Sequence, residues 1–556
     1  MKRLEDESGY LTHRGNGALP DPSRPCCRTA VVATLMLWAG FPSIGQPQAI
    51  GGDWLGGFRA KSGWMALRAR FGVREGALRG TIDLPSEGRM GVIAERLVAD
   101  STGVSFELDH EEERLSFIGR VDGRMIEGTV RSRIGTREFA LARRVEIHPW
   151  LMDRYVGVYQ LAPRRFIALM QWGSGPAFVE LPIGRAGNLA VTSDTSFVAG
   201  PALAIPAPVR ATIMMKHDEA GQIRGLWYRE QPGGAEVFAR RQQPGTEKVT
   251  FRSASVTLAG TLLLPPGVGP HPAIVTLGGG GSPEPRNIAN ALTFLYRGIA
   301  VLTFDKRGGH GSTGDFYTST FSDLADDAVA AVRYLKTRAE IDRASIGLFG
   351  HSNGTIYAPL AATRSNDIAF LVLESASAVP HWQQWLHETE GPMRAAGFGD
   401  SDVNDALAYK SLMIEVGRTG ERWDSLRALR SKYRDKAWFS FAGEWGSLKD
   451  LQAYYRGYVS YDPGGALAKV RVPILVTFGG MDRTVWPDVN IPVLEAAARR
   501  AGNRELTIKV FPTGNHGLVD VPTTRPGEDY NTTGYVNGYF GFLTDWILSR
   551  GRRTRR

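Results

Sequence analysis

The stretch SIGLFGHSNGT, residues 345–355, decides how the second half of this chain is interpreted. It places Ser352 between Gly350 and Gly354, directly after an apolar run and directly before a segment with helical spacing. A strand, a tight turn and a helix in this order lift a serine hydroxyl above the edge of a sheet, and the turn admits only small neighbours. Because this glycine spacing also occurs by chance, the interpretation depends on the rest of the chain.

The hydrophobic pattern around this stretch predicts a parallel sheet. Nearly continuous apolar runs of strand length occur at residues 271–279, 299–305, 345–350, 368–375, 472–480 and 505–512. Helical segments separate these runs, and the clearest of them, residues 321–338, has an apolar stripe formed by Leu324, Ala328, Val332 and Leu335. Apolar strands that alternate with helices are typical of a mostly parallel, doubly wound α/β sheet that is covered on both faces.

The first half of the chain has a different pattern, with a period of two residues and frequent glycine turns. We expect two antiparallel β-rich modules, at residues 50–146 and 147–245, with a linker within residues 240–249. On one interpretation these modules hold a ligand or gate a site. On the other, which we favour, they form an interface or aid solubility and bind no ligand.

Residues 1–49 have the features of a targeting segment. The apolar run at residues 29–40 follows Arg24 and Arg28, and it is shorter than the roughly 20 residues that a membrane-spanning helix requires. We therefore expect a secretory signal and export to the periplasm or the exterior. An uncleaved membrane anchor and a buried helix are the alternatives, and membrane contact is expected only through this segment if it is uncleaved.

The composition argues against several classes of protein. At 556 residues the chain is long enough for several domains, and a hydrophobic content of 43% is that of a folded protein. The formal charge of +9 comes mainly from scattered arginines, so nucleic-acid binding is not expected. The two cysteines, Cys26 and Cys27, are adjacent and offer neither a disulfide framework nor a cysteine metal site.

Two further residues complete a nucleophilic site around Ser352. A serine hydroxyl needs a base to take its proton and an acid to orient that base. His516 follows the last predicted strand and Asp482 follows the strand before it, so both are expected at the carboxyl edge of the sheet. The competing acids are Asp488, which begins the following helix, and Asp520, which comes after His516.

Acyl transfer also needs two backbone N–H donors for the oxyanion of its tetrahedral intermediate. We expect one from Asn353, next to Ser352, and the other from the four glycines at residues 278–281. Gly280 is the first choice and Gly279 the alternate. The other interpretations are a flexible turn or a phosphate-binding loop, although GGGGSPEP lacks the Lys-Ser/Thr ending of a P-loop.

From about residue 248 to 548 the chain resembles the α/β-hydrolase superfamily of serine hydrolases, especially its esterase, acyl-thioesterase and prolyl-oligopeptidase-like branches. Five segments carry the resemblance in the family's order: VTLAGTLLLPPGVGPHPAIVTLGGGG, FDKRGGHGSTG, GLFGHSNGT, YDPGGALAKVRVPILVTFGGMDRTV and FPTGNHGL. The resemblance implies an α/β-hydrolase fold over residues 246–550 and a catalytic triad of Ser352, Asp482 and His516.

The resemblance has further implications and two departures. It implies that Arg307 with Asp305 holds the loop after the second matched strand. The family often has His-Gly where this chain has Gly278-Gly279, and a further glycine where it has Thr355. The first departure concerns the oxyanion loop, and the second concerns packing behind the tight turn.

The insertion at residues 378–460 is implied to form a helical cap over the active site. Its tryptophans either wall an apolar acyl or aryl pocket or pack the cap onto the core, and the sequence leaves both roles open. These tryptophans are Trp382, Trp385, Trp423, Trp438 and Trp445.

Together these features predict an exported serine hydrolase that cleaves a carboxylic ester, or a related acyl bond, of a small-molecule substrate through an acyl-enzyme on Ser352. No metal or organic cofactor is implied. The enzymatic alternatives are an acyl-thioesterase and a prolyl-oligopeptidase-like peptidase or amidase, although the propeller repeat that usually precedes such peptidases is missing. The alternative of another class is a binding protein that acts through the β modules.

Overall fold

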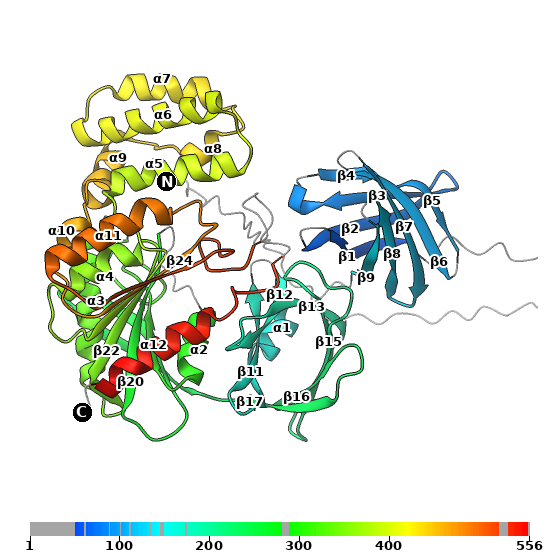
Figure 1. Ribbon diagram of the computed structural model, residues 1–556, viewed down its shortest axis with the longest axis horizontal. Helices are drawn as coiled ribbons and strands as arrows, with labels where there is room; N and C mark the ends of the chain where they lie inside the picture. The colour runs from blue at the N-terminus through cyan, green and yellow to red at the C-terminus, as the bar shows by residue number, and fades with distance from the viewer. Residues whose placement is uncertain are drawn as a thin grey trace, which may run out of the picture.

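The computed structural model describes residues 50–553, apart from residues 61–62, 88, 101, 111–112, 134, 145–148, 173–174, 281–287, 317 and 522–531. The described chain forms three β-sheet units in sequence order, and a group of helices is inserted into the third (Figure 1). The targeting segment predicted at residues 1–49 lies outside the described residues. No helix in the described part of the chain has both the length and the hydropathy needed to cross a membrane.

The first unit is an antiparallel sheet with the strand order β4-β3-β2-β1-β9-β8-β7-β6-β5. Alternate side chains point inward, and the rings of Phe106 and Phe117 stack 4.6 Å apart in its core. A short 3₁₀ helix, Pro85–Glu87, lies between β3 and β4. The strands are β1 Gly52–Ala60, β2 Gly63–Arg74, β3 Ala77–Leu84, β4 Arg89–Ile93, β5 Glu95–Ala99, β6 Gly103–His110, β7 Glu113–Asp122, β8 Met125–Ser132 and β9 Gly135–Arg143.

The second unit is a closed antiparallel barrel of eight strands. Buried side chains such as Tyr159, Phe178 and Phe197 pack its interior, as is usual for an eight-stranded barrel. Helix α1, Pro149–Tyr155, precedes the barrel. The strands are β10 Gly157–Ala162, β11 Arg165–Trp172, β12 Gly175–Leu181, β13 Ala186–Ser193, β14 Ser196–Ala199, β15 Ala211–His217, β16 Ile223–Glu230 and β17 Glu236–Gln242. The expectation of antiparallel β-rich units in the first half of the chain is confirmed.

The third unit is an eight-stranded sheet with the order β18-β19-β21-β20-β22-β23-β24-β25. The first three strands of this order pair antiparallel and the rest pair parallel, as the continuous apolar runs predict. The strands are β18 Gly245–Ser253, β19 Val256–Leu264, β20 His271–Leu277, β21 Ala300–Phe304, β22 Ile341–His351, β23 Phe370–Glu374, β24 Ile474–Gly479 and β25 Leu506–Phe511.

Helices cover both faces of this sheet, so it is a doubly wound α/β sheet. Successive side chains of one strand enter opposite cores: Leu348 packs under α3, α4 and α11, whereas Phe349 packs under α2 and α12. The helices are α2 Ile288–Tyr296, α3 Phe321–Lys336, α4 Gly354–Ala362, α10 Gly464–Leu467, α11 Pro487–Ala501 and α12 Tyr539–Arg553.

The helices of residues 381–459, inserted between β23 and β24, form a separate layer beyond the carboxyl end of the sheet (Figure 1). They bury a core of their own, which contains Trp385, Tyr409 and Trp438. They are α5 His381–Ala395, α6 Asp400–Thr419, α7 Trp423–Tyr433, α8 Phe439–Ala442, α9 Leu448–Tyr454 and a π-helical turn at Tyr455–Val459.

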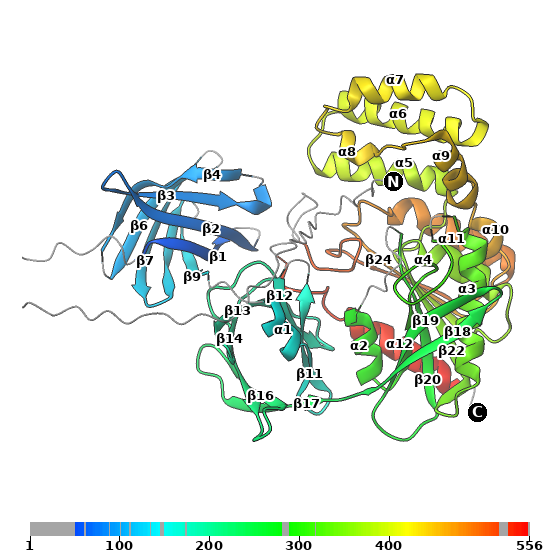
Figure 2. The ribbon, with the colours of Figure 1, turned by 180° about the vertical axis from the view of Figure 1, so that it is seen from behind.

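The barrel packs against the third unit, and the first sheet lies on the other side of the barrel, away from the third unit (Figure 2). Phe166 and Val179 of the barrel share one hydrophobic core with Phe294 and Tyr539 of the α/β unit. Only two residues separate β17 from β18, so the segment predicted as a linker is a direct strand-to-strand connection. The first sheet meets the barrel through smaller clusters, such as Trp64 with Ile205.

Candidate active site

Ser352 lies on the tight turn between β22 and α4. Its φ angle is +52°, in the left-handed region that costs a non-glycine residue about 1–3 kcal/mol. A Cβ atom on Gly350 would lie 2.6 Å from the carbonyl oxygen of Gly354, and one on Gly354 would lie 2.2 Å from that of Leu277. The turn therefore requires both flanking glycines.

Asp482 and His516 form a hydrogen-bonded pair at the carboxyl ends of the next strands. Nδ1 of His516 lies 2.8 Å from Oδ2 of Asp482, whose residue is 1% exposed. The other carboxylate oxygen accepts hydrogen bonds from the backbone N–H groups of Thr484 and Val485, at 2.8 and 2.9 Å. These bonds fix the carboxylate, and the carboxylate leaves Nε2 of His516 free to act as a base when Nδ1 carries the proton.

The pKa of His516 reflects two opposing effects. Burial is the largest single effect and disfavours the charged imidazolium, but the charge and hydrogen bond of Asp482 together with the charges of two glutamates outweigh burial, so the pKa of His516 is raised from its ordinary value. The charges of Glu388 and Glu374 act in the same direction. The surroundings of His516 thus stabilise the positive charge that a general base acquires.

Ser352 and the Asp482–His516 pair meet at the same edge of the sheet but are not yet hydrogen-bonded. Among the described residues, the Ser352 hydroxyl makes no hydrogen bond to His516. Ser352 is linked to the pair through its neighbours: the rings of His351 and His516 lie 5.1 Å apart. Looser contacts of this kind are common in enzymes without bound substrate.

The glycine loop after β20 lies directly against Ser352. A Cβ atom on Gly279 would lie 3.0 Å from Cβ of Ser352, so no larger residue fits there without displacement. The carbonyl of Gly278 accepts a hydrogen bond from the Tyr357 hydroxyl at 3.1 Å, and that of Gly279 accepts one from the ammonium group of Lys306.

These bonds leave backbone donors free beside the serine. Within the described residues, the N–H groups of Gly279, Gly280 and Asn353 donate to no acceptor. A trans peptide points its N–H opposite to its C=O, so the N–H of Gly280 points away from Lys306. The predicted donors Gly280 and Asn353, and the alternate Gly279, are therefore all available. The fourth glycine, at position 281, lies outside the described residues.

The sequence of the chain matches a family that suits this geometry. Residues 262–532 match the sequence model described as "Alpha/beta hydrolase family". This part of the chain belongs to the α/β-hydrolase superfamily.

Individual relatives point the same way. Esterase EstD of Thermotoga maritima is 23% identical over 410 residues, which cover 69% of this chain and 92% of the relative. This share exceeds the α/β-hydrolase unit alone, so the match extends into the β-rich part. An uncharacterised 31.7 kDa Escherichia coli protein of the traX-finO intergenic region is 26% identical, covering 47% of this chain and 88% of its own. The chain is thus an esterase-like α/β-hydrolase.

Solved structures that are similar to this chain are more distant in sequence. Est1E from Butyrivibrio proteoclasticus, in a structure with bound ferulic acid, is 17% identical with a TM-score of 0.34. That match covers 54% of this chain and 98% of Est1E.

In this α/β-hydrolase Arg307 and Asp305, which were expected to hold the loop after β21 together, make separate contacts. Arg307 does not pair with Asp305: it forms ion pairs with Asp327 at 2.8 Å and Asp323 at 3.2 Å, both on α3. Asp305 holds the loop through its main chain, which bonds Ala259 and the hydroxyl of Ser312. The reason is that the long Arg307 side chain reaches the first turns of the helix that follows the loop.

The competing acids lie elsewhere. Asp488 is in the first turn of α11, where its charge acts on His387. The backbone of Asp520 pairs with Gly514 and bonds Gly534. Neither carboxylate forms a hydrogen bond or ion pair with His516 in the described structure.

Helix α5 of the insertion packs against the loop that carries Asp482. The Gln384 amide donates to the carbonyl of Thr484 at 2.8 Å, and the ring of His387 stacks on that of Trp486 at 4.7 Å. One turn further along α5, burial raises the pKa of Glu388. The inserted helices therefore bring a second carboxylate close to the site, which the pattern of acids after the strands did not predict because Glu388 lies on a helix.

The inserted tryptophans mostly pack the insertion itself. Trp385 and Trp438 lie within its core and Trp423 and Trp445 lie against it, whereas Trp382 is 43% exposed. These four therefore pack the insertion's own core, which is neither the wall of a substrate pocket nor the packing of the cap onto the α/β core.

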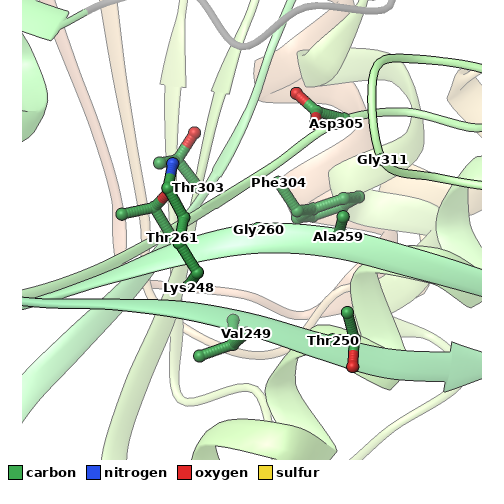
Figure 3. A pocket seen from close by; sticks show the side chains of 10 residues that line it. All are labelled: Lys248, Val249, Thr250, Ala259, Gly260, Thr261, Thr303, Phe304, Asp305 and Gly311. Atoms are coloured by element: carbon green, nitrogen blue, oxygen red, sulfur yellow. The ribbon is translucent and has the colours of Figure 1, made fainter.

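A cavity of about 410 Å³, whose lining is shown in Figure 3, lies in the third unit. It is lined by residues of β18, β19 and β21 and by the loop that follows β21, among them Lys248, Thr261 and Asp305. The Lys248 ammonium donates to the Thr261 hydroxyl at 3.0 Å. Since none of Ser352, Asp482 and His516 lines it, this cavity is not the place where their chemistry occurs.

Proposed function

We propose that this chain is a serine hydrolase that cleaves carboxylic esters through an acyl-enzyme on Ser352. The observation that carries the proposal is the combination of a strained serine turn, a hydrogen-bonded Asp482–His516 pair and free backbone donors at one sheet edge. The similarity to esterase EstD supports an ester as the bond cleaved, and the substrate is then a small molecule.

The mechanism follows from the roles of these groups. Nε2 of His516 removes the proton of the Ser352 hydroxyl as Oγ attacks the ester carbonyl carbon. The carbonyl oxygen becomes an oxyanion, which the N–H groups of Asn353 and of Gly280 or Gly279 bind. His516 then gives the proton to the leaving alcohol oxygen, the C–O bond breaks, and the acyl group remains on Ser352.

Water completes the reaction by the same route. His516 takes a proton from the water as it attacks the acyl-enzyme, and returns this proton to Oγ of Ser352 as the acid leaves. Throughout, Asp482 keeps Nδ1 of His516 protonated and stabilises the imidazolium. Each group needed for both half-reactions is present in the chain.

The direct test is hydrolysis of short p-nitrophenyl esters by purified wild-type protein and by the Ser352→Ala and His516→Ala variants. We expect each substitution to lower kcat by a thousandfold or more. A fluorophosphonate probe should label the wild-type protein and not the Ser352→Ala variant. Wild-type turnover by a clean Ser352→Ala preparation would refute the proposal.

The same assay separates the alternatives. Thioester and aminoacyl-amide substrates with the same acyl group, measured beside the ester, distinguish an esterase from a thioesterase or a peptidase. Absence of probe labelling in folded wild-type protein would instead favour a binding protein.

A further inference from the structure

Two residues at the end of β23 contact both halves of the candidate active site. The carbonyl of Glu374 accepts the backbone N–H of Ser352 at 3.1 Å. The hydroxyl of the next residue, Ser375, donates to the carbonyl of His516 at 2.8 Å. Ser375 is fully buried and has a φ angle of +51°, a conformation that persists only where the surroundings impose it. This junction joins the serine turn to the histidine loop.

The side chain of Glu374 is a buried carboxylate in an unusual setting. The residue is 2% exposed, and its Oε2 accepts from the buried Asn290 amide at 3.1 Å. Its Oε1 lies 2.8 Å from Nδ1 of His351, outside the angle of a good hydrogen bond. No Lys or Arg of the described chain lies within ion-pair distance, so His351 is the only potential cation beside it. Burying a carboxylate without a compensating cation is costly, which suggests a function for this charge.

His351 connects this carboxylate with the candidate base. Its ring lies 5.1 Å from the ring of His516, at an interplanar angle of 52°. Two imidazoles therefore stand between two carboxylates, Glu374 on one side and Asp482 on the other. The other charge that acts on His516 is Glu388 of α5, and all three carboxylates raise the pKa of His516.

We propose that Glu374 is a positioning residue for the reaction proposed above: it holds His351 against His516, and its charge stabilises the imidazolium of His516. Ser375 has the complementary task of holding the main chain of His516. The inference rests on the proposed function, because the stability of the His516 imidazolium affects turnover only if His516 takes the proton from Ser352 or water. The two residues act differently, one through charge and one through a tether, and this difference makes them separable.

Substitution of Glu374 by Gln removes the charge and keeps an oxygen for the Asn290 amide. Without this carboxylate the imidazolium is less stable, so the pKa of His516 falls. The acid limb of the pH profile of kcat/KM should then move to lower pH by about half a unit to one unit, which is the effect of a charge several ångströms away in a partly polar site. The plateau should fall about tenfold, because the transition state carries the imidazolium.

Three further variants make the experiment specific. Glu374→Asp keeps the charge and should keep the acid limb in place. Ser375→Ala should lower kcat about tenfold without moving the acid limb, because it removes a tether and no charge. Glu247→Gln neutralises a carboxylate of β18 that pairs with Arg338, away from the site, and should change neither quantity.

The measurement is kcat/KM for a p-nitrophenyl ester between pH 5 and 9, with the rate of Ser352→Ala subtracted. If Ser352→Ala is as active as the wild type, the proposed function fails, whatever Glu374 does. If activity depends on Ser352 but Glu374→Gln leaves the acid limb in place, Glu374 is only structural and the inference is overturned. If Glu374→Gln fails to fold, His351→Gln takes its place, because this variant keeps the Glu374 charge. The acid limb of the His351→Gln profile should then stay at the wild-type pH or move to higher pH. A move to lower pH would overturn the inference.

Discussion

The ammonium group of Lys306 donates a hydrogen bond to the carbonyl oxygen of Gly279, on the loop that touches Ser352. Lys306 is 6% exposed, and its ammonium also lies 4.7 Å from the ring of Phe316. The bond fixes the plane of the peptide between Gly279 and Gly280, and with it the direction of the Gly280 N–H. A buried cation therefore orients a candidate oxyanion donor.

Lys306→Met should lower kcat with little change in KM. The N–H donor of Gly280 remains in the chain but is no longer held in place, so kcat should fall about tenfold to a hundredfold. Complete removal of an oxyanion donor costs more, roughly a hundredfold to a thousandfold in kcat. Steady-state kinetics with a p-nitrophenyl ester measures both constants. Tyr357→Phe, which frees only the carbonyl of Gly278, is the matched comparison and should cost less. A rise in KM at unchanged kcat would assign Lys306 to substrate binding instead.

Asp482→Asn should reduce kcat about ten-thousandfold while the protein stays folded. An amide in place of the carboxylate can hold His516 in the wrong tautomer and no longer stabilises the imidazolium. Asp488→Asn and Asp520→Asn are the controls, and both should stay within about twofold of the wild type. Loss of activity in either control, with Asp482→Asn active, would move the role of the acid to that residue.

The wild-type pH profile should rise with pH through a midpoint above 6.5. Because the pKa of His516 is raised, this base becomes neutral, and so active, only at a higher pH than an ordinary histidine. The profile of kcat/KM reports the free enzyme and is the appropriate measurement. A midpoint below 6.5 would show that burial outweighs the combined effect of Asp482, Glu388 and Glu374 on His516.

Much of the α/β unit was predictable because its signals are local. Continuous apolar runs predicted the parallel sheet. The glycines around Ser352 predicted a tight turn, and the clashes that a Cβ atom on Gly350 or Gly354 would make confirm it. The rule that acids and histidines at the carboxyl edge converge also located the hydrogen-bonded pair of Asp482 and His516.

The contacts around the site were not predictable in the same way. Glu374 ends an apolar strand at the same edge, so the same rule applies to it, although only one acid was expected beside His516. Lys306 was hidden because its partner is a backbone carbonyl, which has no sequence signature. The sharing of a core by Phe166 and Phe294 depends on the docking of two units, and periodicity describes only one unit at a time.

The two β units should respond differently to truncation, because only the barrel shares a core with the α/β unit. A chain that begins at residue 149 loses the first sheet and exposes only small clusters such as Trp64 with Ile205, so it should fold and keep ester hydrolysis within about threefold. A chain that begins at residue 245 loses the barrel and exposes the core shared by Phe166 and Phe294. It should be insoluble or unfold without cooperativity, and it should be inactive.

The barrel also holds the segment that follows the histidine loop. The carbonyl of Gly184 accepts the N–H of Tyr535 at 2.9 Å, and Tyr535 in turn pairs with Val519 near His516. Circular dichroism melts and ester assays of the two truncated chains provide the comparison. An active, cooperatively folded chain from residue 245 would show that the barrel is dispensable.

The last prediction concerns a buried lysine in the inserted helices. Lys410 is 5% exposed, its ammonium donates to the carbonyl of Ala442 and lies 4.2 Å from the ring of Trp385, and burial lowers the pKa of Lys410 to about 8. In the unfolded chain this pKa is about 10.5. Between these two values the unfolded chain binds more protons than the folded one, so this group makes stability rise with pH from 8 to 10.5.

Lys410→Met removes this dependence. Relative to the variant, the wild type should gain roughly 3 kcal/mol of unfolding free energy between pH 7.5 and 10.5. The loss of the hydrogen bond and of the ring contact shifts the variant by a nearly constant amount, and titration of other groups cancels in the difference. Urea denaturation of both proteins at several pH values measures it. A difference that does not change with pH would mean that Lys410 keeps an ordinary pKa, because water or a neighbouring carboxylate compensates for its burial.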